Sequence, residues 1–197
     1  MRELTTETGA SVPDSSVDNQ RRIMLKIAGI SAAGGCAMHL GVAQAQESGV
    51  QGMSKGDLLV PAKGEQKPVR LEDIKAGAKP LLVFPFDETA QKPRDESRLN
   101  KLLLVRLEEA ELTDELRSRA VSGVLAFSAI CTHQACDVTE YVVADKLLMC
   151  FCHFSKFNPA DGTVAKGPAS KSLPWVPLTQ KDGYVVVAGS FSARPGV

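Results

Sequence analysis

The feature that most constrains this chain is a short window, from Cys131 to His153, that holds most of its thiol and imidazole side chains. The chain has five cysteines and three histidines, and four of those cysteines and two of those histidines lie in this window. The members form two motifs, Cys131-Thr132-His133-Gln134-Ala135-Cys136 and Cys150-Phe151-Cys152-His153. The other two, Cys36 and His39, lie in the N-terminal segment. Because these thiol and imidazole side chains lie in one short window, we expect them to act together at one site.

Two thiolates and two imidazoles at paired short spacings can hold a metal centre, and the spacing alone leaves two centres open. The first is tetrahedral zinc bound by two cysteines and two histidines. The second is a 2Fe–2S cluster in which two histidines replace two cysteines on one iron.

The additional cysteine in each motif favours the cluster, because with it the window resembles the Rieske iron–sulfur proteins. Their motifs read Cys-x-His-x-x-Cys and Cys-x-Cys-His, and both occur here. The resemblance implies one 2Fe–2S cluster with four protein ligands: Cys131 and Cys150 on one iron, His133 and His153 on the other. It also implies a disulfide between Cys136 and Cys152 that ties the two cluster loops together.

Length and composition argue against several other classes of protein. The 197 residues suggest one domain, or a small domain with an appendage. A hydrophobic fraction of 44% is ordinary for a globular protein and is not that of a multispanning membrane protein. The formal net charge is zero, so the chain has no basic field that would attract nucleic acid.

Residues 1–45 have the pattern of an export signal. Arg21 and Arg22 precede an apolar run from Ile27 to Val42, and small residues follow, ending at Ala45. This order predicts a secretory signal cleaved after Ala45, and the paired arginines resemble a twin-arginine (Tat) signal. If the segment were retained, it would instead tether the chain to a membrane.

Export by the Tat pathway agrees with a cluster protein, because that pathway carries folded proteins and a cluster assembled in the cytoplasm travels inside a folded chain. We therefore expect a periplasmic protein. An oxidising compartment also lets a cysteine pair persist as a disulfide.

The remainder of the chain predicts an all-β fold, an antiparallel sandwich or barrel, because short apolar segments alternate with turn residues. Strands are expected at residues 57–60, 68–71, 81–86, 102–107, 123–130, 138–143, 146–149, 175–178 and 184–188. The strand at 81–86 is expected to end at Pro85, and residues 87–100 are expected to form a loop. One surface helix is expected over residues 108–119, with its charges forming a solvated face.

The domain organisation follows from these segments and from the resemblance. Residues 46–67 are interpreted as a linker with a first strand, and residues 68–197 as the Rieske domain. A cluster-binding subdomain is expected at about residues 129–172. Within it, a hairpin over residues 138–149 would bring the two ligand loops side by side.

The resemblance also assigns roles around the cluster. Ser155 matches a serine that donates a hydrogen bond to a bridging sulfide and tunes the potential. Phe157 stands where quinol-oxidising relatives carry a tyrosine, so its missing hydroxyl should lower the potential. The stretch Gly167-Pro168-Ala169 resembles a proline loop that covers the cluster. The outer edges of the histidine rings are expected at the tip, where they exchange protons and meet a partner.

Within the Rieske proteins, residues 150–160 look most like the small subunit of arsenite oxidase, since a Phe follows the last histidine and a Pro-Ala pair follows Phe157. This resemblance implies a non-catalytic electron-transfer subunit. It would pass electrons from a large molybdenum-containing subunit to a cytochrome c or a cupredoxin. Phe151 departs from the usual proline, and Lys166-Gly167-Pro168-Ala169 is closer to the quinol-oxidising type.

Three alternatives remain. The Rieske subunit of a quinol-oxidising cytochrome bc complex would have a more apolar anchor and the tyrosine. A soluble ferredoxin of an oxygenase usually lacks the disulfide pair and an export signal. A zinc module without redox chemistry would show no visible absorbance.

Overall fold

The larger of two β-sheets forms the base of the protein in the computed structural model, which describes residues 52–197. Its strands are β1 (Leu58–Pro61), β2 (Leu81–Asp87), β3 (Lys92–Pro93), β4 (Leu102–Arg106), β5 (Val124–Ser128), β10 (Trp175–Val176), β11 (Leu178–Lys181) and β12 (Tyr184–Val187). They are ordered β10-β5-β4-β2-β1-β12-β11, with β3 paired to β2, and all neighbours are antiparallel. The expected all-β, antiparallel fold is confirmed.

This sheet nearly closes on itself. β10 and β11 are separated only by Pro177, yet they lie at opposite ends of the strand order. β10 pairs with β5, where Trp175 lies opposite Phe127, and β11 pairs with β12, where Leu178 lies opposite Val187. One short stretch of chain therefore forms both margins of the sheet, which gives the base the character of a barrel.

The central strands β4 and β5 are apolar on both faces because each face is covered by a separate core. Alternate side chains of a strand point to opposite faces. Leu104 and Ala126 belong to the core inside the larger sheet, whereas Leu103 and Phe127 belong to a second core. That second core also contains Cys131 and Cys150, so the base supports the cysteine window directly.

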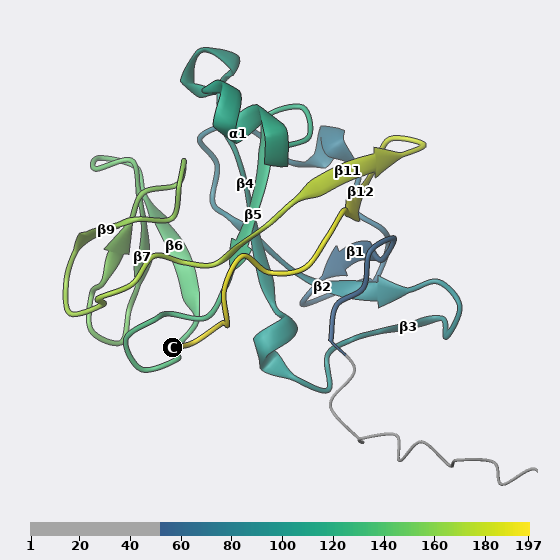
Figure 1. Cartoon of the computed structure of the whole chain (residues 1–197), viewed down its shortest axis with the longest axis horizontal. Coiled ribbons are helices and arrows are strands. Elements are labelled where there is room, and N and C mark those ends of the chain that lie inside the picture. The colour runs from purple at the N-terminus through teal and green to yellow at the C-terminus, as the bar shows by residue number, and fades with distance from the viewer. Residues whose placement is uncertain (1–51) are drawn as a thin grey trace, which may run out of the picture. The chain divides into compact units, whose positions relative to one another are not determined.

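The second sheet lies between β5 and β10 in the sequence. Its strands, in spatial order, are β6 (Val138–Val142), β7 (Leu147–Cys150), β8 (Lys156–Phe157) and β9 (Val164–Lys166). Figure 1 shows β6, β7 and β9 grouped to one side of β4 and β5. The expected hairpin is present as β6 and β7, and it sets Val138 opposite Cys150.

The predicted single helix over residues 108–119 is wrong in its extent. The structure has a 3-10 turn, η3 (Glu109–Glu111), followed by a short helix, α1 (Asp114–Arg119). Thr113 separates the two because its side-chain oxygen accepts a hydrogen bond from the N–H of Leu116 at 3.3 Å and caps α1. The other 3-10 turns are η1 (Leu71–Asp73) and η2 (Arg98–Asn100).

Two strand predictions and one loop prediction also need correction. The segment 68–71 forms only an isolated bridge between Arg70 and Tyr184. The loop expected over residues 87–100 contains the short strand β3 and the turn η2. β2 does not end at Pro85 but continues to Asp87.

Pro85 is tolerated inside β2 because the carbonyl of Arg94, which faces its missing N–H, accepts instead from Nδ2 of Asn100 at 3.0 Å. β4 pairs only with Leu81–Val83 on that side of β2. In an antiparallel strand the N–H and C=O of one residue point the same way, and the carbonyl of Pro85 accepts from the N–H of Arg94 at 2.8 Å. No strand therefore requires a donor from Pro85.

Within residues 52–197, no helix combines the length and the apolar character that a membrane span would need. The signal segment and its cleavage point after Ala45 lie outside the described residues.

Candidate metal centre

Three loops meet at one end of the smaller sheet, and the cysteine and histidine motifs lie on the first two of them. The first loop follows β5 and is closed by a hydrogen bond from the N–H of Cys131 to the carbonyl of Cys136 at 2.7 Å. The second loop joins β7 to β8, where the N–H of Cys150 donates to the carbonyl of Ser155 at 3.0 Å. The third loop follows β9.

A disulfide joins the first two loops, as the resemblance implied. Cys136 and Cys152 are bonded, with their Cα atoms 6.4 Å apart and a sequence separation of 16. The sulfur of Cys150 lies within 4.8 Å of both. This group of three sulfurs is no ligand set, because two of them are bonded to each other and cannot act as thiolates.

The thiols that remain free in the window, Cys131 and Cys150, are both buried, with exposed fractions of 2% and 1%. Burial raises the pKa of the Cys150 thiol, and the neighbouring Cys131 raises it further. The N–H groups of Cys152 and His153 act in the opposite direction. Two adjacent thiolates would be costly in this apolar core, whereas a bound metal cation removes that cost, because coordination replaces the protons.

The two histidines, one from each of the first two loops, lie next to each other. Their ring centroids are 4.7 Å apart and their planes stand at 89°. The Nδ1 atom of His133 is buried and has no hydrogen-bond partner among residues 52–197, which is unfavourable unless a ligand takes it. His153 is exposed. The residues present therefore fit a metal centre with two sulfur and two imidazole donors.

The third loop is packed onto the second at Ser155, which is fully buried. The hydroxyl oxygen of Ser155 accepts from the N–H of Ala169 at 3.1 Å. Gly167 has φ +102°, and a Cβ there would lie 2.6 Å from the Cα of Ser155. Only glycine fits so close an approach, so the Gly-Pro-Ala stretch predicted to be a cover is held against the second loop.

Two exposed aromatic side chains lie within and directly after the second motif, and the sequence alone assigned them no contact role. Phe151 and Phe154 are 55% and 60% exposed, and Phe154 has φ +58°. Exposed large apolar groups mark contact surfaces more often than single small ones do. The available signal was the departure of Phe151 from the usual proline. Phe157, in contrast, is fully buried.

An ion-pair network that sequence reasoning also missed fixes the first loop to the base. Asp137 accepts from Nζ of Lys101 at 2.7 Å and from Nη2 of Arg98 at 2.8 Å. Burial by itself would raise the pKa of Asp137, but the hydrogen bonds from Lys101 and then Arg98 outweigh it and leave the pKa below its usual value. The carboxylate therefore stays ionised beside the disulfide.

Comparison with known proteins agrees with this geometry. The family described as Rieske [2Fe-2S] domain matches residues 72–177. A putative respiratory nitrate reductase subunit Rieske of Haloferax mediterranei is 30% identical over 197 residues, covering 98% of this chain and 84% of the relative. The cytochrome bc1 complex Rieske iron-sulfur subunit of Streptomyces lividans is 33% identical over 151 residues, covering 73% and 86%.

Solved structures include a plasma membrane Rieske protein of Synechocystis PCC 6803, which is 22% identical with a TM-score of 0.39 and covers 61% of this chain and 95% of that one. The family match spans more than half of the chain, and both relatives are covered over most of their length. The chain therefore belongs to the Rieske [2Fe-2S] family, and it is an electron-transfer protein with a Rieske-type 2Fe–2S cluster.

Proposed function

We propose that Cys131 and Cys150 bind one iron of the cluster and that His133 and His153 bind the other. The observation that carries this assignment is the pair of buried, unpaired thiols next to a histidine whose buried Nδ1 lacks a partner. The disulfide supports it, because it excludes Cys136 and Cys152 from the ligand set.

When bound, such a cluster supplies one-electron exchange with no open position for a substrate. The chain's own residues control that exchange. The buried core around Phe157 and Leu148 excludes water from the thiol side, and the hydroxyl of Ser155 is placed to donate a hydrogen bond. The exposed ring of His153 offers the edge where a proton is held or released and where an electron partner approaches.

The partner in this proposal is the large molybdenum-containing subunit of an oxyanion-converting enzyme of the arsenite oxidase type, with a cytochrome c or cupredoxin as acceptor. Residues 150–160 support it through Phe154, Phe157 and the Pro159-Ala160 pair. A relative whose name assigns it to a respiratory nitrate reductase aligns with almost the whole chain. Nitrate, like arsenite, is an oxyanion.

A second candidate is the Rieske subunit of a quinol-oxidising cytochrome bc complex. Relatives named as bc1 subunits favour it. The stretch Lys166-Gly167-Pro168-Ala169 also favours it. The buried phenylalanine at position 157, in place of the tyrosine of that class, is against it.

Export by the Tat pathway and residence in the periplasm are part of the proposal. The paired Arg21-Arg22 and the small residues ending at Ala45 support it. The disulfide agrees with an oxidising compartment. Intact-mass measurement of the native protein tests cleavage, because a mature chain would begin at Gln46, whereas a retained segment would leave the full mass.

The decisive experiment purifies the chain with its native partners and follows its Rieske EPR signal under three treatments. Reduction of the cluster by arsenite, with molybdenum in the complex, would support the arsenite oxidase type. Oxidation of the pre-reduced cluster by nitrate would move the assignment to a nitrate-converting enzyme. Reduction by quinol, with haem proteins copurifying, would establish the bc alternative. A complex that responds to none of the three would overturn both candidates.

A further inference from the structure

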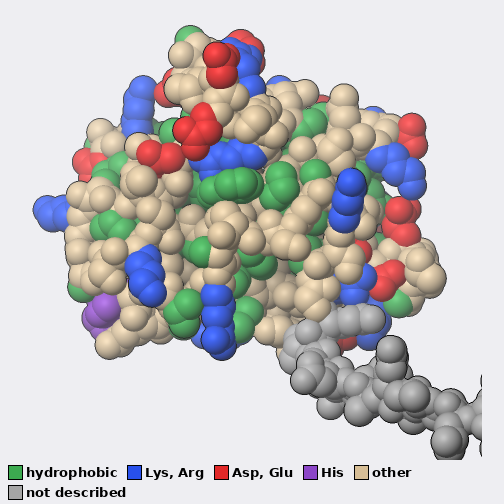
Figure 2. Space-filling model, in the orientation of Figure 1, with side chains coloured by type: hydrophobic (Ala, Val, Ile, Leu, Met, Phe, Trp, Pro, Cys, Tyr) green, Lys and Arg blue, Asp and Glu red, His purple; other side chains and the backbone are tan. Residues whose placement is uncertain are grey.

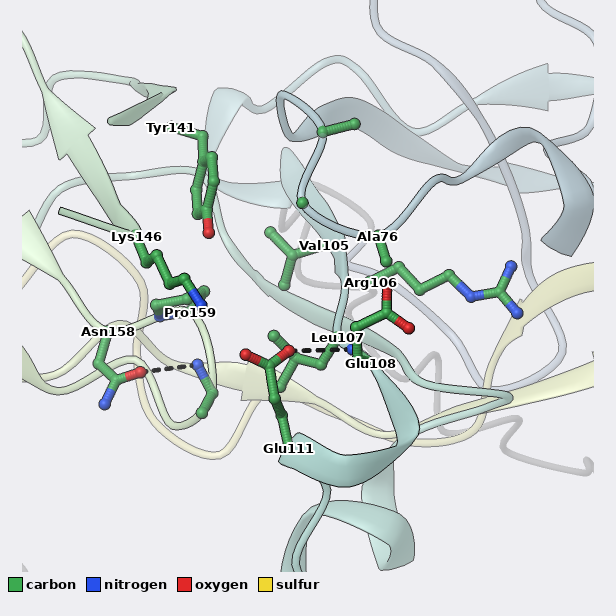
Figure 3. Close-up of a pocket in the computed structure, with 13 residues that line it drawn as sticks. Ala76, Val105, Arg106, Leu107, Glu108, Glu111, Tyr141, Lys146, Asn158 and Pro159 are labelled. Carbon is green, nitrogen blue, oxygen red and sulfur yellow. Dashed lines mark hydrogen bonds between the residues drawn. The ribbon is translucent and has the colours of Figure 1, made fainter. Parts of the chain in front are cut away.

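A cavity of about 320 Å³ lies where the loop Ala76–Ala78, the end of β4, η3 and the smaller sheet meet. Figure 3 shows the side chains that line it. It is separate from the metal centre. Tyr141, which lines the cavity, is three residues along β6 from Val138, the residue opposite Cys150, a separation of about 10 Å.

The walls of the cavity are held in place by contacts between distant segments. Nζ of Lys79 contacts Oε1 of Glu140 at 2.5 Å and joins the loop to β6. Oδ1 of Asn158 accepts from the N–H of Ala160 at 2.9 Å and orders the loop after β8. The cavity therefore exists before anything binds, as is usual for binding sites.

The floor of the cavity is apolar and one wall is aromatic. Val105 is buried and Leu107 is half-buried, and the hydroxyl of Tyr141 points into the cavity (Figure 3). Burial raises the pKa of Tyr141, and the charge of Glu111 raises it further. Glu111 and Tyr141 line the same cavity (Figure 3).

The charged groups that face the cavity are Glu108, Glu111 and Lys146 (Figure 3). Oε2 of Glu111 accepts from the N–H of Glu108 at 3.0 Å, which fixes that carboxylate and leaves Oε1 available. Lys146 forms no ion pair with another residue of the described chain. The cavity therefore has two carboxylates at one end and one ammonium group at the other.

Arg106 also lines the cavity but does not offer its charge to it. Its Nη1 atom donates to the carbonyls of Leu71 and Ile74, each at 3.2 Å, and Figure 3 shows its guanidinium turned away. The surface beyond the carboxylate end is acidic too. Figure 2 shows Asp and Glu side chains gathered at the end of the molecule that α1 occupies in Figure 1.

We propose that this cavity receives an arginine or lysine side chain from a protein partner. The alkyl stem lies over Val105 and Leu107, and the cationic group lies between the carboxylate of Glu111 and the hydroxyl of Tyr141, whose oxygens both accept hydrogen bonds from it. The cavity is lined by neither histidine, so this partner does not need to cover the histidine rings. The inference is independent of which enzyme reduces the cluster.

The test titrates the full-length, cluster-loaded protein with N-acetyl-L-arginine amide, which presents the side chain with uncharged ends. NMR signals of the Tyr141 and Glu111 amides report binding. We expect saturable shifts and affinity about fivefold weaker in Glu111→Gln, the effect of one partly exposed ion pair. Lys146→Gln, which removes a like charge, should bind about twofold more tightly. Glu115→Gln, on the exposed face of α1, is the matched control and should bind as the wild type does.

Opposite effects of Glu111→Gln and Lys146→Gln are a signature of a bound cation that a change in folding would not produce. Glu111→Gln also retains an oxygen for the N–H of Glu108, so the turn η3 is preserved. Absence of saturable shifts would overturn the proposal, as would equal affinity in Glu111→Gln or tighter binding of N-acetyl-L-glutamate amide. If bare guanidinium bound with the same affinity, the proposed contact of the alkyl stem with Val105 and Leu107 would be wrong.

Discussion

The hydroxyl oxygen of Ser155 accepts a hydrogen bond from the N–H of Ala169 at 3.1 Å, and Ser155 is fully buried. One side chain thereby joins the second and third loops. Because Ala169 uses a lone pair, the hydroxyl proton stays free for a second partner, and the proposed partner is a bridging sulfide of the cluster.

Replacing Ser155 by Ala should lower the reduction potential by about 60–130 mV, the equivalent of one hydrogen bond to a charged group for a one-electron couple. Redox titration followed by EPR measures it. Ser172→Ala, at an exposed position of the third loop, should leave the potential unchanged. Equal potentials in both variants would show that Ser155 serves packing alone.

Phe157→Tyr should raise the potential, because the new hydroxyl would donate to a ligand sulfur and disperse its negative charge. The expected rise is also of the order of 60–130 mV, measured by voltammetry. Phe127→Tyr, a buried ring in the base, should lower stability without moving the potential. If Phe157→Tyr behaved in that second way, its hydroxyl would lack the expected sulfur partner.

His153→Cys should lower the potential by more than about 200 mV, because the thiolate that replaces the neutral imidazole ligand brings a negative charge to the iron. The EPR spectrum should change at the same time. Phe154→Ala, next to it on the exposed tip, should keep both the spectrum and the potential. An unaltered spectrum in His153→Cys would remove His153 from the ligand set.

Removal of the disulfide in a Cys136→Ser, Cys152→Ser double variant should lower the free energy of unfolding by about 3 kcal/mol, given the loop of 16 residues that it closes. Urea unfolding with and without a thiol reductant provides the control. The reductant should weaken the wild type and leave the double variant unaffected. Equal stability of the two oxidised proteins would assign the disulfide no role in stability.

The buried side chain of Arg119 allows the contribution of its volume to stability to be separated from that of its charge. Its guanidinium is buried, lies 4.8 Å from the Trp175 ring and donates to the carbonyl of Ala160 at 3.1 Å. Within the part of the chain that the structure describes, its Nε and Nη1 atoms have no hydrogen-bond partner. Burial lowers the pKa of Arg119. Arg119→Ala should cost about 2–3 kcal/mol through lost packing and hydrogen bonding.

Arg119→Met should cost less than Arg119→Ala, because the apolar chain fills the same space without burying unpartnered N–H groups. Urea unfolding of the three proteins measures the order. If Met were as destabilising as Ala, the charge and its hydrogen bond, and not the volume, would hold the loop.

The sequence predicted the features that depend on local pattern. The strands β4, β5 and the β6–β7 hairpin follow from apolar runs and a turn, and the Cys136–Cys152 pairing from the motif resemblance. The sequence did not show that β4 and β5 lie between two separate cores. A run such as Leu102–Val105 shows only that both faces of the strand are apolar.

The features that were missed depend on contacts between distant segments. Arg119 looked like part of a solvated charged face, and only the folding of β10 and the loop after β8 onto α1 buries it. Pro85 looked like a strand end, and only the side chain of Asn100, which donates to the carbonyl opposite Pro85, makes its missing N–H harmless. Asp137 gave no local sign of pairing with residues 98 and 101.

The larger sheet can close only late in synthesis, because β10 and β11, which adjoin Pro177, form its two margins. The residues of the cysteine window are made before the segment Trp175–Lys181 that supplies both margins of the larger sheet. While the chain emerges, a complete set of metal donors stands on a base that has not closed. A chain that stopped before residue 175 would contain all four proposed ligands but would lack β10, β11 and β12. The larger sheet would then stay open beneath the cysteine window, so we expect the support of the cluster to depend on these last strands.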